Sequence, residues 1–117
     1  MPTIRITAEQ AGISMPANLN TSKTAEELKG VLPVEGSAQV WGDEIYFSVP
    51  VSMPEDDAQA EVPSGTIAYW PPGNAFCIFF GQTPYSPVNV LGQMEGDAKE
   101  FGRVEPGEIV RVELVQD

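Results

Sequence analysis

The 117-residue sequence contains no histidine and a single cysteine, Cys77. Without histidine it has no Ser-His-Asp or Cys-His catalytic group and no histidine-ligated zinc or iron site. One cysteine cannot form an internal disulfide. Because Cys77 stands between apolar residues with no charge beside it, we do not expect a reactive thiolate either. The sequence therefore predicts no catalytic residue, no metal site and no cofactor, and it weighs against an enzyme.

Basic residues are also scarce. Six Lys and Arg stand against 17 Asp and Glu, which gives a formal net charge of −11. Nucleic acids and anionic membranes are bound by clustered Lys and Arg, so we expect neither as a partner. The longest apolar run, 75–80, is far shorter than the roughly 20 residues of a membrane span. The first residues begin a strand pattern and not a signal peptide, so the expected location is the cytoplasm.

What is present predicts a mainly β protein. Apolar residues make up 42%, and the 11 glycines and 11 prolines indicate many turns between short strands. One amphipathic stretch predicts a short helix near residues 22–32, ended by Pro33. Alternating and apolar runs predict about seven or eight strands, and hence one closed or nearly closed barrel over residues 1–117. The expected strands are 3–8, 13–19, 37–41, 44–49, 66–70, 75–80, 88–94 and 109–115.

The hairpin at Gly42-Asp43 shows which side chains share a face. In a two-residue turn Trp41 pairs with Glu44, which separates an apolar face, expected in the core, from a mixed face. The apolar face is Ala38, Val40, Ile45, Phe47 and Val49, and the mixed face is Gln39, Trp41, Glu44, Tyr46 and Ser48. Aromatic rings beside hydrogen-bonding groups are typical of a ligand-contact surface, and equally of a half-buried pair on the outside of a barrel. Both interpretations stay open.

Other segments carry weaker signals. Both faces of 75–80 are apolar, which predicts a strand covered on both sides, as a core strand or with one face lining a pocket. Pro72 and Gly73 suit the centre of a type II turn. The acidic run 55–57 lacks the glycine and terminal Glu of an EF-hand loop, so we expect a solvated loop. Among the carboxylates, Glu44 alone has aromatic neighbours that would raise its pKa for acid–base work.

Three blocks of the sequence resemble a family. Residues 40–51 resemble the block W-G-[DE]-E-I-Y-F-x-x-P-V, residues 65–84 resemble G-x-x-x-Y-W-P-P-G-x-A-x-C-x-F-F-G-x-T-P, and residues 88–92 resemble V-N-V-[IL]-G. These blocks occur in the same order in small prokaryotic cyclophilin-like proteins of the Thermotoga type, a family of unknown function. The resemblance covers nearly the whole chain and implies a reduced, closed cyclophilin-type β-barrel with few helices.

The resemblance also allows a comparison with the residues that true cyclophilins use for catalysis. True cyclophilins are peptidyl-prolyl isomerases with an arginine, a glutamine, aromatics and a histidine around a proline pocket, whereas this chain has no histidine and no arginine between Arg5 and Arg103. We therefore expect a barrel that binds an unidentified small molecule or peptide without catalysis. Its predicted contacts are Trp41, Glu44, Tyr46, Tyr69, Trp70, Phe76, Phe80 and Gln82, with Arg103 as an anion contact. The alternatives are an isomerase-like or other enzyme and a protein-interaction or regulatory subunit; a homo-oligomer is left open.

Overall fold

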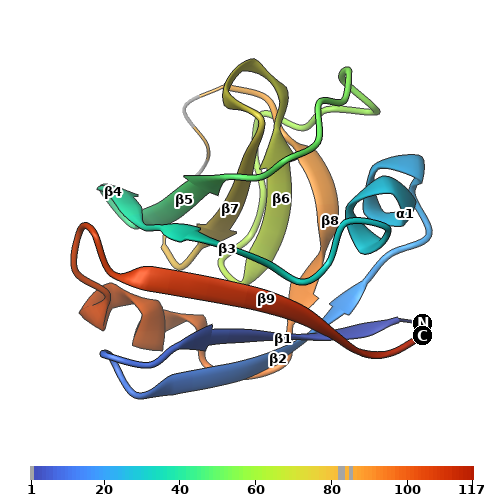
Figure 1. The fold of residues 1–117 in the computed structure, drawn as a ribbon. Helices are drawn as coiled ribbons and strands as arrows, with labels where there is room; N and C mark the ends of the chain where they lie inside the picture. Colours follow the sequence, from blue (N-terminus) through green and yellow to red (C-terminus); the bar gives the residue numbers. More distant parts are fainter. Residues whose placement is uncertain (1, 82–83, 85) are drawn as a thin grey trace.

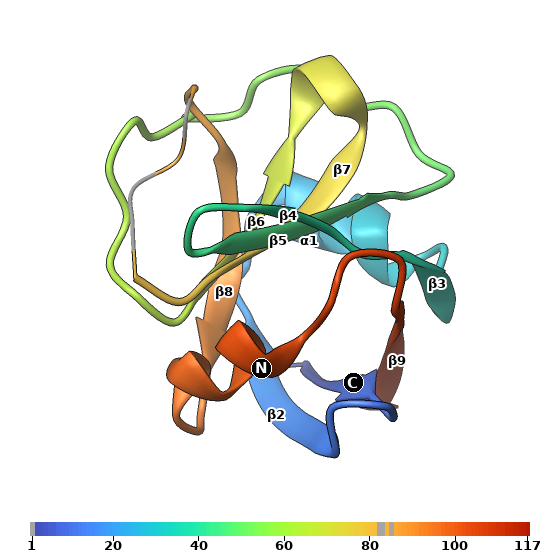
Figure 2. The same ribbon diagram turned by 90° about the vertical axis from the view of Figure 1, so that its left-hand side faces the viewer.

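The strands form a single antiparallel sheet that rolls into a nearly closed barrel (Figures 1 and 2). The computed structural model describes residues 2–81, 84 and 86–117. The sheet has nine strands in the described residues, one or two more than predicted, in the order β3-β9-β1-β2-β8-β6-β7-β5-β4. They are β1 (Thr3–Ala8), β2 (Ile13–Leu19), β3 (Val34–Ser37), β4 (Gln39–Trp41), β5 (Glu44–Ser48), β6 (Thr66–Trp70), β7 (Ala75–Phe79), β8 (Asn89–Met94) and β9 (Ile109–Gln116).

The extra strand comes from a break in the predicted strand 37–41. β3 pairs with β9, whereas β4 pairs with β5, so one stretch of chain supplies both ends of the sheet. Ala38 lies between them, 2% exposed, and its amide donates to the Glu108 carbonyl at 2.8 Å. Across the seam, Gly36 packs against the ring of Phe47, where a Cβ would come within 2.6 Å. The barrel is thus closed here by packing and chain connection.

The predicted helix is present but shorter. α1 (Lys23–Lys29) begins at Ser22, whose hydroxyl accepts from the Ala25 amide at 3.1 Å, and lies beside β8 (Figure 1). It ends at Gly30 and not at Leu32, because the next amides bond to carbonyls three residues back, in a tighter turn. Two short 3-10 helices follow later in the chain, η1 (Pro71–Gly73) and η2 (Ala98–Arg103). No helix within the described ranges is long and apolar enough to cross a membrane.

Apolar side chains pack on both faces of β7, as the sequence predicted. Phe76 and Ile78 point into the barrel and join its main core, whereas Cys77 and Phe79 point outward. The outward residues build a second, smaller cluster, here called the outer cluster. Its buried members are Val62, Ala68, Ala75, Cys77, Phe79 and Val88. A strand in the middle of this sheet is therefore buried on both sides, which is unusual for an antiparallel barrel with one solvated face.

The acidic loop 54–61 is anchored to β8 and α1 by side-chain hydrogen bonds. Buried Asn89 accepts from the Asp56 amide at 2.9 Å and donates to the Pro54 carbonyl at 2.9 Å and to the Thr24 hydroxyl at 3.2 Å. The Asp56 carboxylate in turn accepts from the Thr24 hydroxyl at 3.0 Å. Asp56 is therefore half-buried and structural, whereas Glu55 and Asp57 on either side of it are exposed, as expected of a solvated loop. Among the described residues no cluster of three or more His, Cys, Asp or Glu could hold a metal ion.

Candidate functional site

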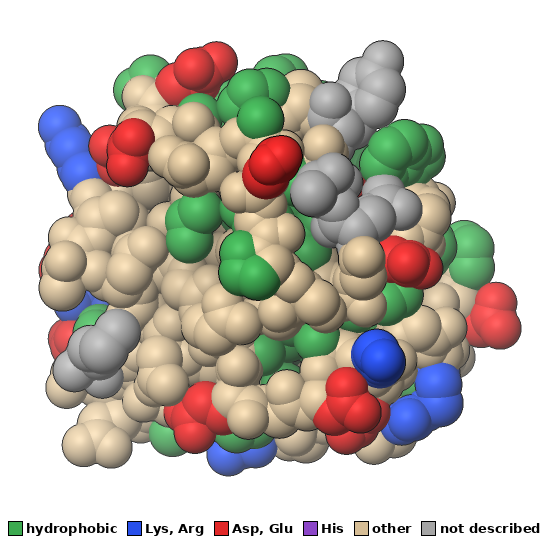
Figure 3. Space-filling view, turned by 180° about the vertical axis from the view of Figure 1, so that it is seen from behind, with side chains coloured by type: hydrophobic (Ala, Val, Ile, Leu, Met, Phe, Trp, Pro, Cys, Tyr) green, Lys and Arg blue, Asp and Glu red, His purple; other side chains and the backbone are tan. Residues whose placement is uncertain are grey.

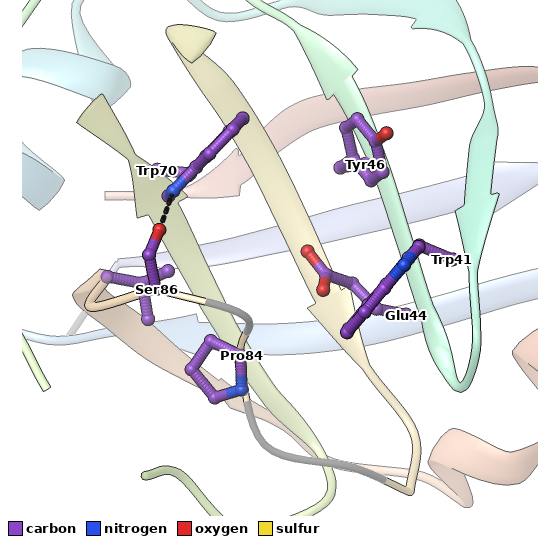
Figure 4. Close-up of a pocket in the computed structure, with 7 residues that line it drawn as sticks. Trp41, Glu44, Tyr46, Trp70, Pro84 and Ser86 are labelled. Atoms are coloured by element: carbon purple, nitrogen blue, oxygen red, sulfur yellow. Dashed lines mark hydrogen bonds between the residues drawn. The ribbon is translucent and has the colours of Figure 1, made fainter. Parts of the chain in front are cut away.

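A pocket of about 160 Å³ lies on the outer face of the sheet, beside the outer cluster. Strands β4 and β5 supply one side of it, and β6 with the segment that leads into β8 supplies the other (Figure 4). The lining residues are Trp41, Glu44, Tyr46, Trp70, Pro84, Ser86 and Val88. Four of the nine residues predicted as ligand contacts thus lie together: Trp41, Glu44, Tyr46 and Trp70.

The register predicted for the β4–β5 hairpin is confirmed. Trp41 pairs with Glu44 and Gln39 with Tyr46, which puts the mixed face toward the pocket. The other face is buried as predicted except at Val40, which is 38% exposed because β4 is the last strand of the sheet. The buried members are Ala38, Ile45, Phe47 and Val49.

The tip of this hairpin is fixed in place. Gly42 has a φ of +58°, which the first central position of a tight hairpin turn requires. The Phe80 amide donates to the Asp43 carbonyl at 3.0 Å, and a Cβ on Gly81 would lie 2.5 Å from the Asp43 carboxylate. The turn is therefore docked against the end of β7, and the position of Trp41 follows from it.

Trp70 and Tyr46 form two walls that meet at a corner. Their ring centroids are 6.4 Å apart with an angle of 69° between the planes. The indole N–H of Trp70 donates to the Ser86 hydroxyl (Figure 4). The same ring lies against Gly73, where a Cβ would come within 2.6 Å.

The type II turn predicted at Pro72 and Gly73 is wrong. The 3-10 helix η1 forms instead, and Asn74, not Gly73, takes the left-handed conformation at φ +48°.

Glu44 supplies the carboxylate of the pocket. It is 8% exposed, opposite Phe79 in the β5–β7 ladder, and Figure 4 shows its carboxylate pointing into the space between the labelled side chains. Burial raises the pKa of Glu44, and a hydrogen bond with the Cys77 thiol lowers it in part. The salt bridges among the described residues all lie elsewhere. Glu44 is thus a largely desolvated carboxyl that forms no ion pair with a Lys or Arg in the described part of the chain.

Burial, more than the contact with Glu44, lowers the reactivity expected of Cys77. The side chain is fully buried in the outer cluster. Burial raises the pKa of the Cys77 thiol well above its ordinary value, and the neighbouring charge of Glu44 raises it further. A thiol in this setting stays protonated and unreactive.

Four of the other predicted contacts do not line the pocket, and the fifth lies outside the described residues. Tyr69, Phe76 and Phe80 are buried in the main core, on the opposite side of the sheet from Trp70. The Arg103 guanidinium donates to the Ala11 carbonyl at 2.9 Å, away from the pocket. Gln82 lies outside the described residues.

The alternation of side chains along a strand would have predicted that Tyr69 and Phe76 face away from Trp70. Tyr69 and Trp70 are consecutive on β6, so they must point to opposite faces, and the pairing of Trp70 with Ala75 puts Phe76 on the side of Tyr69. In contrast, the sequence gives no signal for Pro84, Ser86 and Val88, since their part in the pocket depends on how the chain returns across the sheet.

This arrangement limits the chemistry of the pocket. Its described lining holds one carboxylate, so a pair of carboxyl groups for glycosidase-like catalysis is not assembled there. It also holds no lysine or arginine that could polarise a carbonyl group. What it offers is aromatic surface, two hydroxyl groups and one buried acid, which are binding groups.

Comparisons with known proteins agree with the architecture. The family model described as "Cyclophilin-like" matches residues 2–113. The solution structure of the hypothetical protein AF2241 from Archaeoglobus fulgidus is 31% identical, with a TM-score of 0.80 over 97% of this chain and 95% of that chain. McbB, solved in complex with tryptophan, is 20% identical with a TM-score of 0.78 over 94% of this chain and 44% of that one, a likeness in fold. No curated protein matches the chain.

Proposed function

The chain belongs to the cyclophilin-like family, and we propose that it binds one group of a small molecule or peptide in the pocket between Trp41 and Trp70, without catalysis. One observation carries the proposal. Both tryptophans of the chain, together with Tyr46 and the buried acid Glu44, converge on this one concavity. Aromatic walls with a few polar groups are the composition of binding sites for small ligands.

The volume of the pocket indicates what size of group it takes. At about 160 Å³ it matches an engineered cavity of about 150 Å³ that binds benzene. Pockets for drug-sized ligands are larger, about 300–1,000 Å³. The pocket therefore suits a single head group or side chain whose remainder stays outside. The complex of McbB with tryptophan supports a small-molecule role for a protein that contains such a barrel.

Binding can be tested with the two tryptophans as reporters. A fragment library is screened by following the two indole N–H signals in NMR spectra, since both indoles line the pocket. We expect hits that shift both signals and that lose affinity in the double variant Trp41→Ala/Tyr46→Ala. Val115→Ala, an apolar truncation at a 53% exposed site on β9, serves as the control. Hits that bind the folded double variant as tightly as the wild type would rule out this site.

The two alternatives give different results. An isomerase needs a cation on the prolyl amide, whose rotation barrier is about 18–20 kcal/mol. We expect a coupled tetrapeptide assay to show no rate above background, because the described lining has no lysine or arginine. An interaction subunit would instead use Trp41 and Val40, 46% and 38% exposed, as contacts with a protein partner. A library without any hit would favour that alternative.

A further inference from the structure

The walls of the pocket are of a kind that attracts positive charge. The faces of Trp and Tyr rings carry negative electrostatic potential, and a cation within about 6 Å of a ring centroid is attracted to it. Trp70 and Tyr46 stand at 69° to each other, so they form two sides of a corner and not one stack. Trp41, at the mouth, contributes a third aromatic ring to the lining.

The carboxylate of Glu44, like the aromatic rings, favours a positively charged ligand. Glu44 is 8% exposed and points into the space that the rings enclose (Figure 4). A buried carboxylate is costly unless a positive group lies beside it. Its protein neighbours include a neutral thiol, Cys77, and no cation makes an ion pair with it in the described part of the chain. A cationic ligand would supply the missing counter-charge.

The charge of the whole protein also favours a cationic ligand over an anionic one. The formal net charge is −11, and acidic side chains are spread over much of the face shown in Figure 3. A protein field of this sign raises the local concentration of cations and repels anions. In addition, the indole N–H of Trp70 already donates to Ser86, so one donor that could hold an anionic group is occupied.

We propose that the group which enters this pocket is an alkylammonium ion, held between the rings of Trp41, Tyr46 and Trp70 with its charge against Glu44. The inference rests on the proposed binding function and names its ligand class. The pocket volume of about 160 Å³ is close to that of the engineered cavity that binds benzene. A trimethylammonium group has fewer heavy atoms than benzene, so it fits in the pocket. It can be carried by a free small molecule or by a methylated lysine of a peptide, which share this chemistry.

The decisive comparison is between two ligands that differ only in charge. Choline and 3,3-dimethylbutan-1-ol have the same shape, but the second has carbon in place of the nitrogen. Each is titrated into the full chain while tryptophan fluorescence and the indole N–H signals are followed. We expect choline to bind about tenfold more tightly or better, as desolvated cation–aromatic contacts and one opposite charge predict.

Single-residue variants test whether the preference for choline over its neutral isostere arises in the pocket. Glu44→Gln keeps the size of the side chain and is expected to remove most of the preference for choline. Glu27→Gln removes the same charge from the exposed face of α1, outside the pocket, and is expected to leave the preference unchanged. Trp41→Leu is expected to weaken choline more than its neutral isostere. Because Trp41 is 46% exposed, this variant is expected to fold.

The outcomes separate the two proposals. Equal or tighter binding of the neutral isostere overturns the ammonium assignment and leaves the pocket as an apolar site. A preference for choline that persists in Glu44→Gln places the cation elsewhere and also overturns it. If no member of the pair binds while neutral library compounds do, the ligand class is wrong and the binding function stands. A peptide with trimethyl-lysine that binds at least tenfold more tightly than choline identifies a protein as the source of the group.

Discussion

Removal of one hydroxyl group should affect stability very differently at the two tyrosines that the sequence analysis placed in one binding site. In Tyr69→Phe the lost hydroxyl is fully buried, accepts from the Met53 amide at 3.0 Å and lies 2.9 Å from both the Val51 carbonyl and Asn74 Oδ1. In Tyr46→Phe the lost hydroxyl is at the half-buried pocket, where it makes no hydrogen bond to another described residue. The first is a structural group and the second a candidate ligand contact.

The expected magnitude follows from these contacts. Tyr69→Phe leaves the amide of Met53, which is 8% exposed, without its acceptor, a loss that costs about 1–3 kcal/mol. We therefore expect the free energy of unfolding to fall by about 2 kcal/mol. For 117 residues the unfolding entropy is about 0.25 kcal/mol/K, so Tm should fall by about 8 °C. Tyr46→Phe should change the free energy of unfolding by less than about 0.5 kcal/mol.

Urea denaturation and calorimetry on the wild type and both variants measure these changes, and choline titration adds a second readout. We expect Tyr69→Phe to keep the affinity of the folded protein. The reasoning is refuted if Tyr69→Phe is as stable as the wild type, or if Tyr46→Phe is destabilised by as much.

Three further outcomes are expected. Gly73→Ala should displace the Trp70 ring, lower stability by about 1–3 kcal/mol and weaken ligand binding, whereas Gly102→Ala, whose methyl would meet Phe80 at an ordinary 3.6 Å, should change little. Since burial raises the pKa of Glu44 above its unfolded value of 4.5, wild-type stability relative to Glu44→Gln should be highest below pH 4.5 and decline as pH rises through the folded pKa. Cys77 should resist Ellman's reagent in the folded protein and react once urea unfolds it, because it is fully buried.

Each of these has a result that contradicts it. Equal loss of stability in Gly73→Ala and Gly102→Ala would mean that contact with Trp70 is not the cause. A difference in stability between wild type and Glu44→Gln that does not vary with pH would show that burial does not perturb this carboxyl. Labelling of Cys77 in the native protein, at a rate above that of unfolding, would show that the outer cluster opens.

Much of the fold could be predicted because short-range rules apply to it. Gly42-Asp43 fixes the turn, the turn fixes the pairing of Trp41 with Glu44, and alternation then assigns each side chain to a face. The apolar pattern of β7 likewise predicted cover on both sides. The helix end was missed, because Gly30 ends α1 through local backbone bonds before Pro33 can act.

The candidate site was predicted in part, for two different reasons. Composition alone grouped Tyr69 with Trp70, although adjacent residues on a strand face opposite ways, so a stricter use of alternation would have separated them. By contrast, Ser86 could not be found from the sequence, since its contact with Trp70 depends on the path of the chain between β7 and β8. Local pattern determines faces, whereas the packing of distant segments determines which faces meet.

The break at Ala38 also bears on how this protein avoids unwanted association. A free strand edge is a template on which another chain can add, and short edges reduce that hazard. The two edges of the described sheet are its shortest strands, β3 with four residues and β4 with three. They are consecutive halves of one stretch, and the Gly36–Phe47 contact joins the β3 side of the seam to β5. The sheet therefore presents little continuous backbone to a neighbouring molecule, which disfavours growth by strand addition.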